Sequence, residues 1–317
     1  MSMTNSPGTR PPLIVVVGSI NMDLVARMVH LPRPGETVSG ESFQTISGGK
    51  GANQAVAASR LGARVVMIGR LGDDSFGTTL RQNLIAEGID TDHVIETTGC
   101  SSGVALIGVE STGANAITVI PAANGRLSED DVLSRRAIIA AANALIVQLE
   151  TPIPTVAAAL RIAKQHGVLS VLDPAPAAPL PEALIQVDIL SPNQSEAETL
   201  TGICVRDWDS AESAARELQR RGAKDVVIKL GSSGACLCSH DGKVQRISAV
   251  SADIVDTTAA GDAFTAALTV ARCEGHSLAD ATRFGCLAGT LACTRFGAQP
   301  AMPTRAELER WTELSKT

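Results

Sequence analysis

The chain has 317 residues, of which 44% are hydrophobic and only 2% aromatic, and its formal net charge is −6. A chain of this length and composition can bury a large core of aliphatic side chains, as one α/β domain or two smaller ones. The acidic balance argues against nucleic acid and anionic membranes as main partners, since both are polyanions.

Three further features bear on the compartment. The seven cysteines are odd in number and show no CxxC pair or zinc-like spacing, which favours reduced thiols in a cytoplasmic protein. The tail at 1–12 is polar and proline-rich and lacks the pattern of a signal peptide. The most apolar segment, 137–149, is too short to cross a bilayer. We therefore expect a soluble cytoplasmic protein without a membrane partner.

The first element expected is a buried parallel strand at 13–17, because this short apolar run ends in Gly18. Segment 19–23 follows it, at the position where open α/β sheets bind ligands. Asn21 and Asp23 in that segment offer an amide and a carboxylate, which suit the hydroxyl groups of a sugar. The alternative is a turn in which both side chains bond to nearby backbone.

Two stretches with β-like sequence interrupt the α/β pattern, at about 24–47 and 101–121. The first predicts short strands outside the main sheet. In the second, apolar runs at 104–107 and 117–120 flank the turn-forming segment 111–115, which is typical of a hairpin. We expect the two groups of strands to pack together as a small lid.

Between these stretches, the glycine-rich segment 48–55 leads into an alanine-rich helix that ends near Gly62. Such glycines permit a close approach of backbone to a ligand. The segment is not a Walker A loop, because Gln44 occupies the place of its first glycine and neither Ser nor Thr follows Lys50. The chain also lacks a GxGxxG after the first strand and any HExxH, which argues against dinucleotide binding and zinc hydrolysis.

The middle of the chain alternates strands and helices in the manner of a parallel α/β fold. The expected elements are strands at 65–68, 144–149, 168–172, 189–190 and 226–230, and helices at 75–87 and 154–166. Polar residues recur just beyond strand ends, at Asn21, Asp23, Glu150, Asp173, Asn193 and Glu196. This recurrence predicts a ligand site along one edge of the sheet.

Two segments in this region allow more than one interpretation. Asn193 and Glu196 share a helical face and could order water around Mg²⁺ and phosphate, but the same pair could form a capping-box analogue. Segment 231–234 could pass over a nucleotide as a flexible turn, or it could be an ordinary hairpin.

Segment 256–262 lies between a strand-like run, 250–255, and an alanine-rich helix expected at 263–271. The small residues at 259–261 would let a phosphoryl group approach the free N–H groups of a first helical turn. A carboxylate repels an anion at such a site, so its presence there suggests a chemical role. Asp262 could accept a proton from an attacking hydroxyl. The alternative is an ordinary acid at a helix N-terminus, with the small residues serving packing.

Taken together, these residues resemble the ribokinase-like (PfkB) carbohydrate kinases. Segment 48–55, followed by Gly62 and Gly72, matches one family signature, and segment 256–268 matches the other. The likeness extends over 13–303. It implies a single three-layer αβα domain with a central, mainly parallel sheet and a small β-sheet lid.

The resemblance implies an ATP-dependent kinase that phosphorylates a free pentose, D-ribose, at its 5-hydroxyl group. Asp262 would be the base, and the amides of Ala259, Ala260 and Gly261 would stabilise the migrating phosphoryl group. The sugar would be held by Asn21, Asp23, Gly49, Lys50, Asn53 and Glu150. Mg²⁺–ATP would lie against Asn193, Glu196, Lys229, Gly231, Ser232 and Gly234, with Glu196 acting on Mg²⁺ through water.

The resemblance also implies a monovalent cation, usually K⁺, beside the phosphoryl site. Its ligands would be Asp256 and the carbonyl groups of Thr258, Ala292, Arg295 and Gly297. Ala301 stands where some family members have a serine, so one ligand is in doubt, and water could replace it or activation could be weaker. The family habit further implies a homodimer formed through the lid sheets.

Other substrates fit the same scaffold: a nucleoside such as adenosine, fructose, or 2-keto-3-deoxygluconate. A nucleoside needs a stacking platform for its base, and five Phe and two Trp leave few candidates. A catalytically silent sugar-binding protein is a different class of alternative. Such a protein would be expected to lose the base or the small residues at 259–261, and this chain keeps both.

Overall fold

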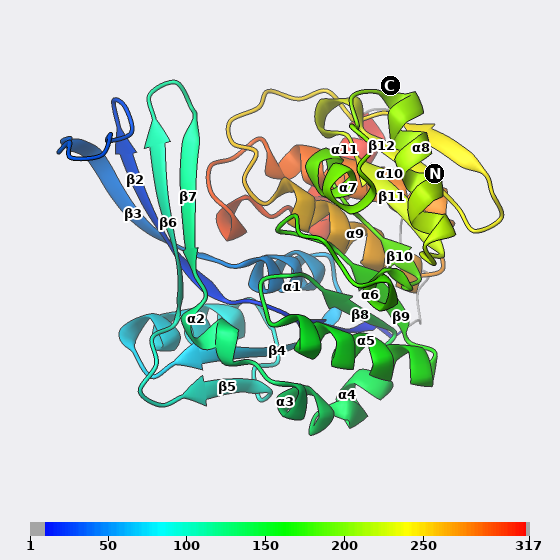
Figure 1. The fold of residues 1–317 in the computed structure, drawn as a ribbon, viewed down its shortest axis with the longest axis horizontal. Coiled ribbons are helices and arrows are strands. Elements are labelled where there is room, and N and C mark those ends of the chain that lie inside the picture. The colour runs from blue at the N-terminus through cyan, green and yellow to red at the C-terminus, as the bar shows by residue number, and fades with distance from the viewer. Residues whose placement is uncertain (1–9, 315–317) are drawn as a thin grey trace.

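The computed structural model describes residues 10–314 and shows a large sheet between two layers of helices, with a smaller sheet to one side (Figure 1). Within the described residues, the large sheet has nine strands in the order β13-β12-β11-β10-β9-β8-β1-β4-β5. Its strands are β1 (Leu13–Val17), β4 (Arg64–Gly72), β5 (Val94–Thr97), β8 (Ala144–Val147), β9 (Leu169–Leu172), β10 (Ile189–Leu190), β11 (Asp225–Lys229), β12 (Ala235–Cys238) and β13 (Val244–Ile247). All pairings from β11 to β5 are parallel, and β12 and β13 add antiparallel strands at one edge.

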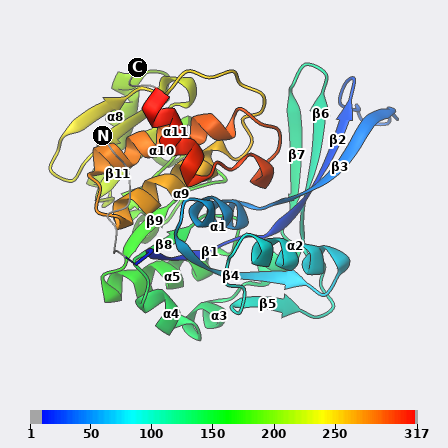
Figure 2. The ribbon, with the colours of Figure 1, turned by 180° about the vertical axis from the view of Figure 1, so that it is seen from behind.

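Helices cover both faces of this sheet, which confirms the predicted three-layer αβα architecture (Figure 2). One face carries α1 (Lys50–Arg60), α2 (Ser75–Ala86), α9 (Ala260–Cys273), α10 (Leu278–Ala292) and α11 (Arg305–Leu314). The other carries α3 (Glu129–Leu133), α4 (Arg136–Ala140), α5 (Ile153–His166), α6 (Glu182–Ile185), α7 (Gln194–Thr201) and α8 (Trp208–Arg220). Because β1 is covered on both faces, its residues are apolar throughout, with Ile14 and Val16 in one core and Val15 and Val17 in the other.

The smaller sheet is the predicted lid, and it projects from the body of the molecule (Figure 1). It contains β2 (Asn21–Met28), β3 (Gly40–Gly48), β6 (Gly103–Glu110) and β7 (Asn115–Ile120), in the order β3-β2-β6-β7. The hairpin expected in 101–121 is the antiparallel pair β6–β7. Apolar side chains remain exposed on this sheet, at Phe43, Leu106, Ile117, Val119 and Ile120.

Two predictions about local structure were wrong. The lid begins earlier than the expected position of about 24, because β2 already starts at Asn21. Asn21 and Asp23 are paired within the lid sheet, so the turn considered as their alternative is not formed. Segment 250–255 does not form a strand but runs as an irregular loop. The Val255 N–H group bonds instead to the Cys293 carbonyl just past α10, at 2.8 Å, and the side chains of Ile254 and Val255 stay exposed.

The predicted strand and helix order elsewhere is observed, with ends shifted by one to a few residues. The helix ends carry the residues expected there: Gly167 takes a left-handed conformation at the end of α5, and Asn193 caps the N-terminus of α7. Segment 231–234 includes a short 3-10 turn (Gly231–Ser233) that joins the antiparallel strands β11 and β12. Among the helices of the described residues, none is long and apolar enough to span a bilayer.

Candidate active site

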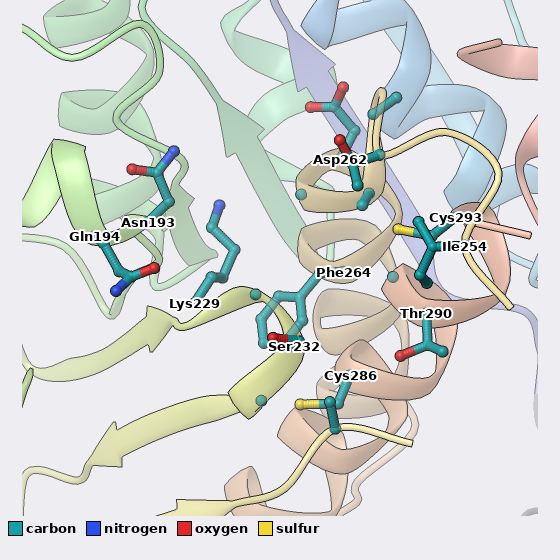
Figure 3. A pocket seen from close by; sticks show the side chains of 18 of the residues that line it. Asn193, Gln194, Lys229, Ser232, Ile254, Asp262, Phe264, Cys286, Thr290 and Cys293 are labelled. Atoms are coloured by element: carbon teal, nitrogen blue, oxygen red, sulfur yellow. The ribbon is translucent and has the colours of Figure 1, made fainter. Parts of the chain in front are cut away.

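A cavity of about 840 Å³ lies at the carboxyl ends of the parallel strands, beside the N-terminus of α9 (Figure 3). Many residues predicted for the site line it: Lys50, Asn193, Glu196, Lys229, Gly231, Ser232, Gly234, Ala259, Ala260, Gly261 and Asp262. They come from segments far apart in the chain, including the starts of α1, α7 and α9 and the turn after β11. The fold therefore brings the two glycine-containing motifs to one place.

The N-terminus of α9 presents backbone donors to this cavity. Ala259 is the N-cap residue and has a φ of 59°, a left-handed conformation that is unusual for a residue with a side chain. The Ala260 N–H group makes only a long contact, 3.3 Å, to the Thr257 carbonyl. The N–H groups of the first turn have no acceptor within the helix, and the helix dipole adds partial positive charge. Small side chains at 259–261 leave these donors accessible to an anion.

Asp262 is buried in the first turn of α9, and side chains of α1 hold both of its carboxylate oxygens. Asn53 Nδ2 donates to one oxygen at 3.0 Å, and Gln54 Nε2 donates to the other at 2.9 Å. The side chain is only 3% exposed although it lines the cavity. An ordinary acid at a helix N-terminus is solvated, whereas this carboxylate is fixed and directed towards the space that a ligand would fill.

The hydrogen-bond network continues from Asp262 into the sheet. Gln54 Nε2 also donates to Asp173 Oδ2 at 2.8 Å, and Gln148 Nε2 donates to Gln54 Oε1 at 2.6 Å. The ammonium of Lys229 lies 2.7 Å from Asp173 Oδ1. One glutamine of α1 thus connects Asp262 with a buried ion pair at the ends of β9 and β11.

The residues predicted to bind sugar lie between the lid and α1. Asn21 and Asp23 point from β2 and are buried, and the side-chain oxygen Oδ1 of Asn21 accepts a 2.7 Å bond from Asn124 Nδ2. Glu150 follows β8 and accepts a bond from the Lys50 backbone N–H at 3.2 Å. These side chains are thus held next to the start of α1, which carries Asn53 on the same helix.

Two glycines in this region are required by close contacts. A Cβ at Gly48 would lie 2.2 Å from Asp23 Oδ2, so a larger residue there would displace the carboxylate. Gly49 has a φ of +88°, and a Cβ on it would lie 2.6 Å from the Asn21 backbone nitrogen. The glycine pair therefore lets the β3–α1 connection pass directly over β2.

Burial and neighbouring charge shift the acids of the site towards neutrality. Burial raises the pKa of Asp262 to about 6; Lys50 opposes this shift, and Asp173 adds to it. Burial, with repulsion from Glu150 and Asp262, raises the pKa of Asp23 to about 7. Such values near neutral pH are typical of groups that exchange protons during catalysis.

Lys50 is the positive centre of the site. Burial alone would lower the pKa of its ammonium, but the surrounding carboxylates of Asp262, Asp173 and Glu150 raise that pKa above its ordinary value. The group therefore stays charged at neutral pH, within a cavity whose other ionisable side chains are mostly acids.

Asn193 and Glu196 form the capping box that was the alternative to a role with metal. Asn193 Oδ1 accepts from the Glu196 N–H group at 2.9 Å, and Glu196 Oε2 accepts from the Asn193 N–H group at 2.7 Å. Burial raises the pKa of Glu196. Both residues nevertheless line the cavity, so the cap also fixes an amide and a carboxyl group at its wall.

The loop before α9 is tied to the chain after α10 through Asp256. One carboxylate oxygen accepts from the Thr258 N–H group at 2.9 Å, and the other accepts from the Gly297 N–H group, also at 2.9 Å. Although burial opposes the shift, these hydrogen bonds keep the pKa of Asp256 below its ordinary value, so the group is ionised. Within the described part of the chain, no cluster of three or more His, Cys, Asp or Glu could hold a metal ion by itself.

Several residues in or beside the site had no specific role in the prediction from sequence. Gln54 and Asp173 contact Asp262 or its partners, and Asn124 fixes Asn21. The wall formed by α10 and the loop 249–254 was also missed. Asp173 had a signal, as a polar residue at a strand end, and Gln54 directly follows Asn53, but Asn124 and α10 carried no local pattern.

Comparisons with known proteins agree over almost the whole chain. A family model described as pfkB family carbohydrate kinase matches residues 11–305. The ribokinase of Haemophilus influenzae is 42% identical over 301 residues, covering 95% of this chain and 98% of its own, and that of Bacillus subtilis is 40% identical over 297 residues, covering 93% and 98%. A structure of Arabidopsis thaliana ribokinase complexed with ribose and ATP has a TM-score of 0.88 at 35% identity, covering 95% of this chain and 98% of that one.

Asp262→Asn is expected to stabilise the folded protein above about pH 6, because the folded state then no longer buries a charge. The difference between the ordinary pKa of 3.8 and the value of about 6 corresponds to roughly 3 kcal/mol. Since a raised folded-state pKa costs stability only when the group is ionised, the gain should shrink as pH falls below about 6. The Asn53 Oδ1 atom is buried without a partner. If the Asn53 amide rotates, this oxygen can accept a hydrogen bond from the amide nitrogen that Asp262→Asn introduces.

Thermal unfolding at several pH values measures this effect. Asp280→Asn is the matched control, because Asp280 also lies in the first turn of a helix but has a pKa below its ordinary value. That replacement should lower the melting temperature. Equal losses for both variants would show that Asp262 is an ordinary helix-capping acid.

Proposed function

The chain belongs to the pfkB family of carbohydrate kinases, and on this premise we propose that it transfers the γ-phosphoryl group of ATP to the 5-hydroxyl group of D-ribose. It is a phosphotransferase with an alcohol group as acceptor. The observation that carries the proposal is the buried carboxylate of Asp262, held by two amides at a helix N-terminus that opens into a large cavity.

Ribose would bind between the lid and the start of α1. Asn21, Asp23, Gly49, Lys50, Asn53 and Glu150 would form the pocket. The carboxylates and amides among them accept or donate hydrogen bonds, and ring hydroxyl groups can satisfy both kinds of partner. The lid strand β2 carries Asn21 and Asp23, so lid position and sugar binding are coupled in this proposal.

The reaction would be a direct in-line displacement. Asp262 takes the proton of the 5-hydroxyl group while that oxygen forms a bond to the γ-phosphorus, and the bond to the β–γ bridging oxygen breaks, releasing ADP. The first-turn amides of α9, at Ala259, Ala260 and Gly261, would stabilise the charge of the transferring group. The protein's work is mostly positioning and electrostatic stabilisation.

Nucleotide would occupy the cavity along Asn193, Glu196, Lys229, Gly231, Ser232 and Gly234. The cavity wall fits a metal that arrives on the phosphates, because Glu196 lies in that wall and can bond to a metal-bound water. When bound with ATP, Mg²⁺ would neutralise part of the phosphate charge.

A monovalent cation, K⁺ or a similar ion, would bind beside the phosphoryl site. Asp256 provides an ionised carboxylate there, and it joins the two loops that hold the remaining proposed ligands. Those ligands are the carbonyl groups of Thr258, Ala292, Arg295 and Gly297. Ala301 is fully buried and offers no side-chain oxygen to such an ion, so the site has one ligand fewer than in family members with serine.

Asp262→Asn is expected to bind ribose and to lower kcat by a factor on the order of 10²–10⁴, the usual cost of losing a general base. Coupled assays of ADP release would measure turnover with ribose, 2-deoxyribose, fructose, adenosine and 2-keto-3-deoxygluconate, each with K⁺ and with Na⁺. The wild-type protein should prefer ribose and respond to K⁺. Asp280→Asn serves again as control and should keep full turnover. Near-normal turnover of Asp262→Asn would refute its role as base.

Asp23→Ala is expected to raise the KM for ribose far more than the KM for ATP, because Asp23 lies on the lid side of the site, outside the residues that line the nucleotide cavity. Steady-state kinetics with each substrate varied in turn would measure both constants. Asp92→Ala, an exposed position outside the site, is the control and should change neither constant. Similar changes in both KM values would argue against a sugar contact.

We further propose a homodimer through the lid sheets. Ile117 and Val119 are exposed on the lid face that also carries Asp23, and a second lid packed there would cover both. Because strand residues alternate between faces, Thr118 points to the opposite face.

Light scattering at micromolar concentration should give the mass of a dimer. Ile117→Lys should produce monomers, whereas Thr118→Lys should leave the dimer intact. A monomeric wild-type protein would contradict the proposal, and dissociation by Thr118→Lys alone would contradict the choice of face.

A further inference from the structure

Lys229 ends β11, and its side chain lies in the cavity wall (Figure 3). Its backbone is anchored to the segment before α7, through a bond from its N–H group to the Pro192 carbonyl at 2.8 Å and an isolated bridge to Asn193. The side chain is 11% exposed and pairs with Asp173, which is 2% exposed. The lysine stem is therefore held in one place, while its head group can still reach the cavity.

The ammonium of Lys229 faces the N-terminus of α9. A Cβ built on Gly261 would lie 3.6 Å from Lys229 Nζ, and this distance makes the ammonium a neighbour of the first-turn amides. Asp262 follows directly in the same turn. The phosphoryl group that those amides would bind is thus within reach of the same ammonium by rotation of a flexible side chain.

The charge balance of the cavity makes the Lys229 ammonium important. Its wall contains the carboxyl groups of Asp173, Glu196 and Asp262, and the ammonium groups of Lys50 and Lys229. Although burial opposes the shift, the nearby charges of Asp262, Asp173 and Glu150 raise the pKa of the Lys50 ammonium. With three acids and two bases, the cavity is not positive by itself, although it must accept the phosphates of a nucleotide.

Asp173 is held between Lys229 and Gln54. One oxygen accepts the ammonium at 2.7 Å, and the other is fixed by Gln54 Nε2 at 2.8 Å. The same Gln54 nitrogen bonds to Asp262. Asp173 therefore does two things: it pairs with the Lys229 ammonium, and it shares the Gln54 amide with Asp262.

We propose that Lys229 is a catalytic residue, whose ammonium moves from Asp173 to the γ-phosphoryl group of the bound nucleotide. This inference rests on the proposed phosphotransfer. During the displacement, the ammonium stays protonated and donates a hydrogen bond to a γ-phosphoryl oxygen, while Asp262 receives the hydroxyl proton and ADP leaves with the electron pair of the broken P–O bond. Gln54 keeps Asp173 and Asp262 in place through this exchange.

The competing explanation is a buried ion pair that serves only the fold. Removing either partner of such a pair leaves an uncompensated charge and is strongly destabilising, and both removals should then act alike. The proposal instead predicts an asymmetry: loss of Lys229 removes a contact with the phosphoryl group, whereas loss of the Asp173 charge only frees the lysine.

Nucleotide binding without sugar tests this directly. Calorimetry would measure the Kd of two ligands, the Mg²⁺ complex of a non-hydrolysable ATP analogue and that of ADP. The proteins compared would be the wild type, Lys229→Met, Lys229→Arg and Asp173→Asn. Lys229→Met should raise the Kd of the ATP analogue by about tenfold or more and the Kd of ADP by much less, since a charge-assisted hydrogen bond to the γ-phosphoryl group is lost. Asp173→Asn should not weaken binding of the analogue. Lys229→Arg should bind the analogue more tightly than Lys229→Met does, because it keeps a positive charge.

Turnover gives a second measure. Lys229→Met should lower kcat with ribose by a factor on the order of 10², as expected for a lost donor to developing charge, with the Kd of ribose unchanged. Lys243→Met is the matched control, because Lys243 is also paired with an aspartate but is 74% exposed on the surface. It should leave all of these quantities unchanged.

Equal weakening of ATP-analogue and ADP binding by Lys229→Met, or equal damage from Lys229→Met and Asp173→Asn, would overturn the proposal and support a structural ion pair. Failure of the wild type to phosphorylate any sugar would instead contradict the proposed function. The two failures are distinguishable, because the binding comparison needs no sugar.

Discussion

The site depends on one constraint: a carboxylate must remain buried and ionisable beside donors that attract anions. Asp262 meets this constraint because two amides of α1 fix its oxygens, and because Lys50 offsets part of the cost of burial. The packing of α1 against α9 on one face of the sheet therefore serves both the core and the chemistry. Helix α1 in turn can start where it does only because Gly48 and Gly49 pass closely over β2.

The same arrangement connects the two halves of the site. The lid strand β2 carries Asn21 and Asp23, α1 carries Asn53 and Gln54, and α9 carries Asp262. A single helix, α1, thus lies between the proposed sugar side and the proposed nucleotide side, and it bonds to Asp262. Repulsion from Asp262 contributes to the raised pKa of Asp23, so the acids of the two sides are also coupled electrostatically.

Much of the architecture could be predicted from the sequence because its causes are local. Apolar runs ending in glycine or a polar residue marked the parallel strands, and the two glycine-containing motifs marked the starts of α1 and α9. The strand predicted at 250–255 was wrong, because composition does not show that the Val255 N–H group bonds to the end of α10 and not to a neighbouring strand. The lid was expected to begin at about 24 instead of at Asn21, because the passage from β1 to β2 takes only three residues and leaves no turn signature.

The long-range contacts of the site could not be predicted in this way. Gln54 bonds to residues 119 and 208 positions away, and only the packed fold brings Asp173 and Lys229 together. The resemblance to a family supplied roles for matching positions, but it assigned no role to Gln54 or Asp173. These residues emerge from the hydrogen-bond network, in which a single amide serves two carboxylates.

The most direct measurement is a crystal structure of the protein with ribose and a non-hydrolysable ATP analogue. The account predicts that the ribose 5-hydroxyl oxygen lies within about 3 Å of an Asp262 carboxylate oxygen, in line with the γ-phosphorus. The γ-phosphoryl oxygens should face the first turn of α9. A 5-hydroxyl group directed towards Asp23 or Glu150 instead, with the phosphates away from α9, would contradict the account.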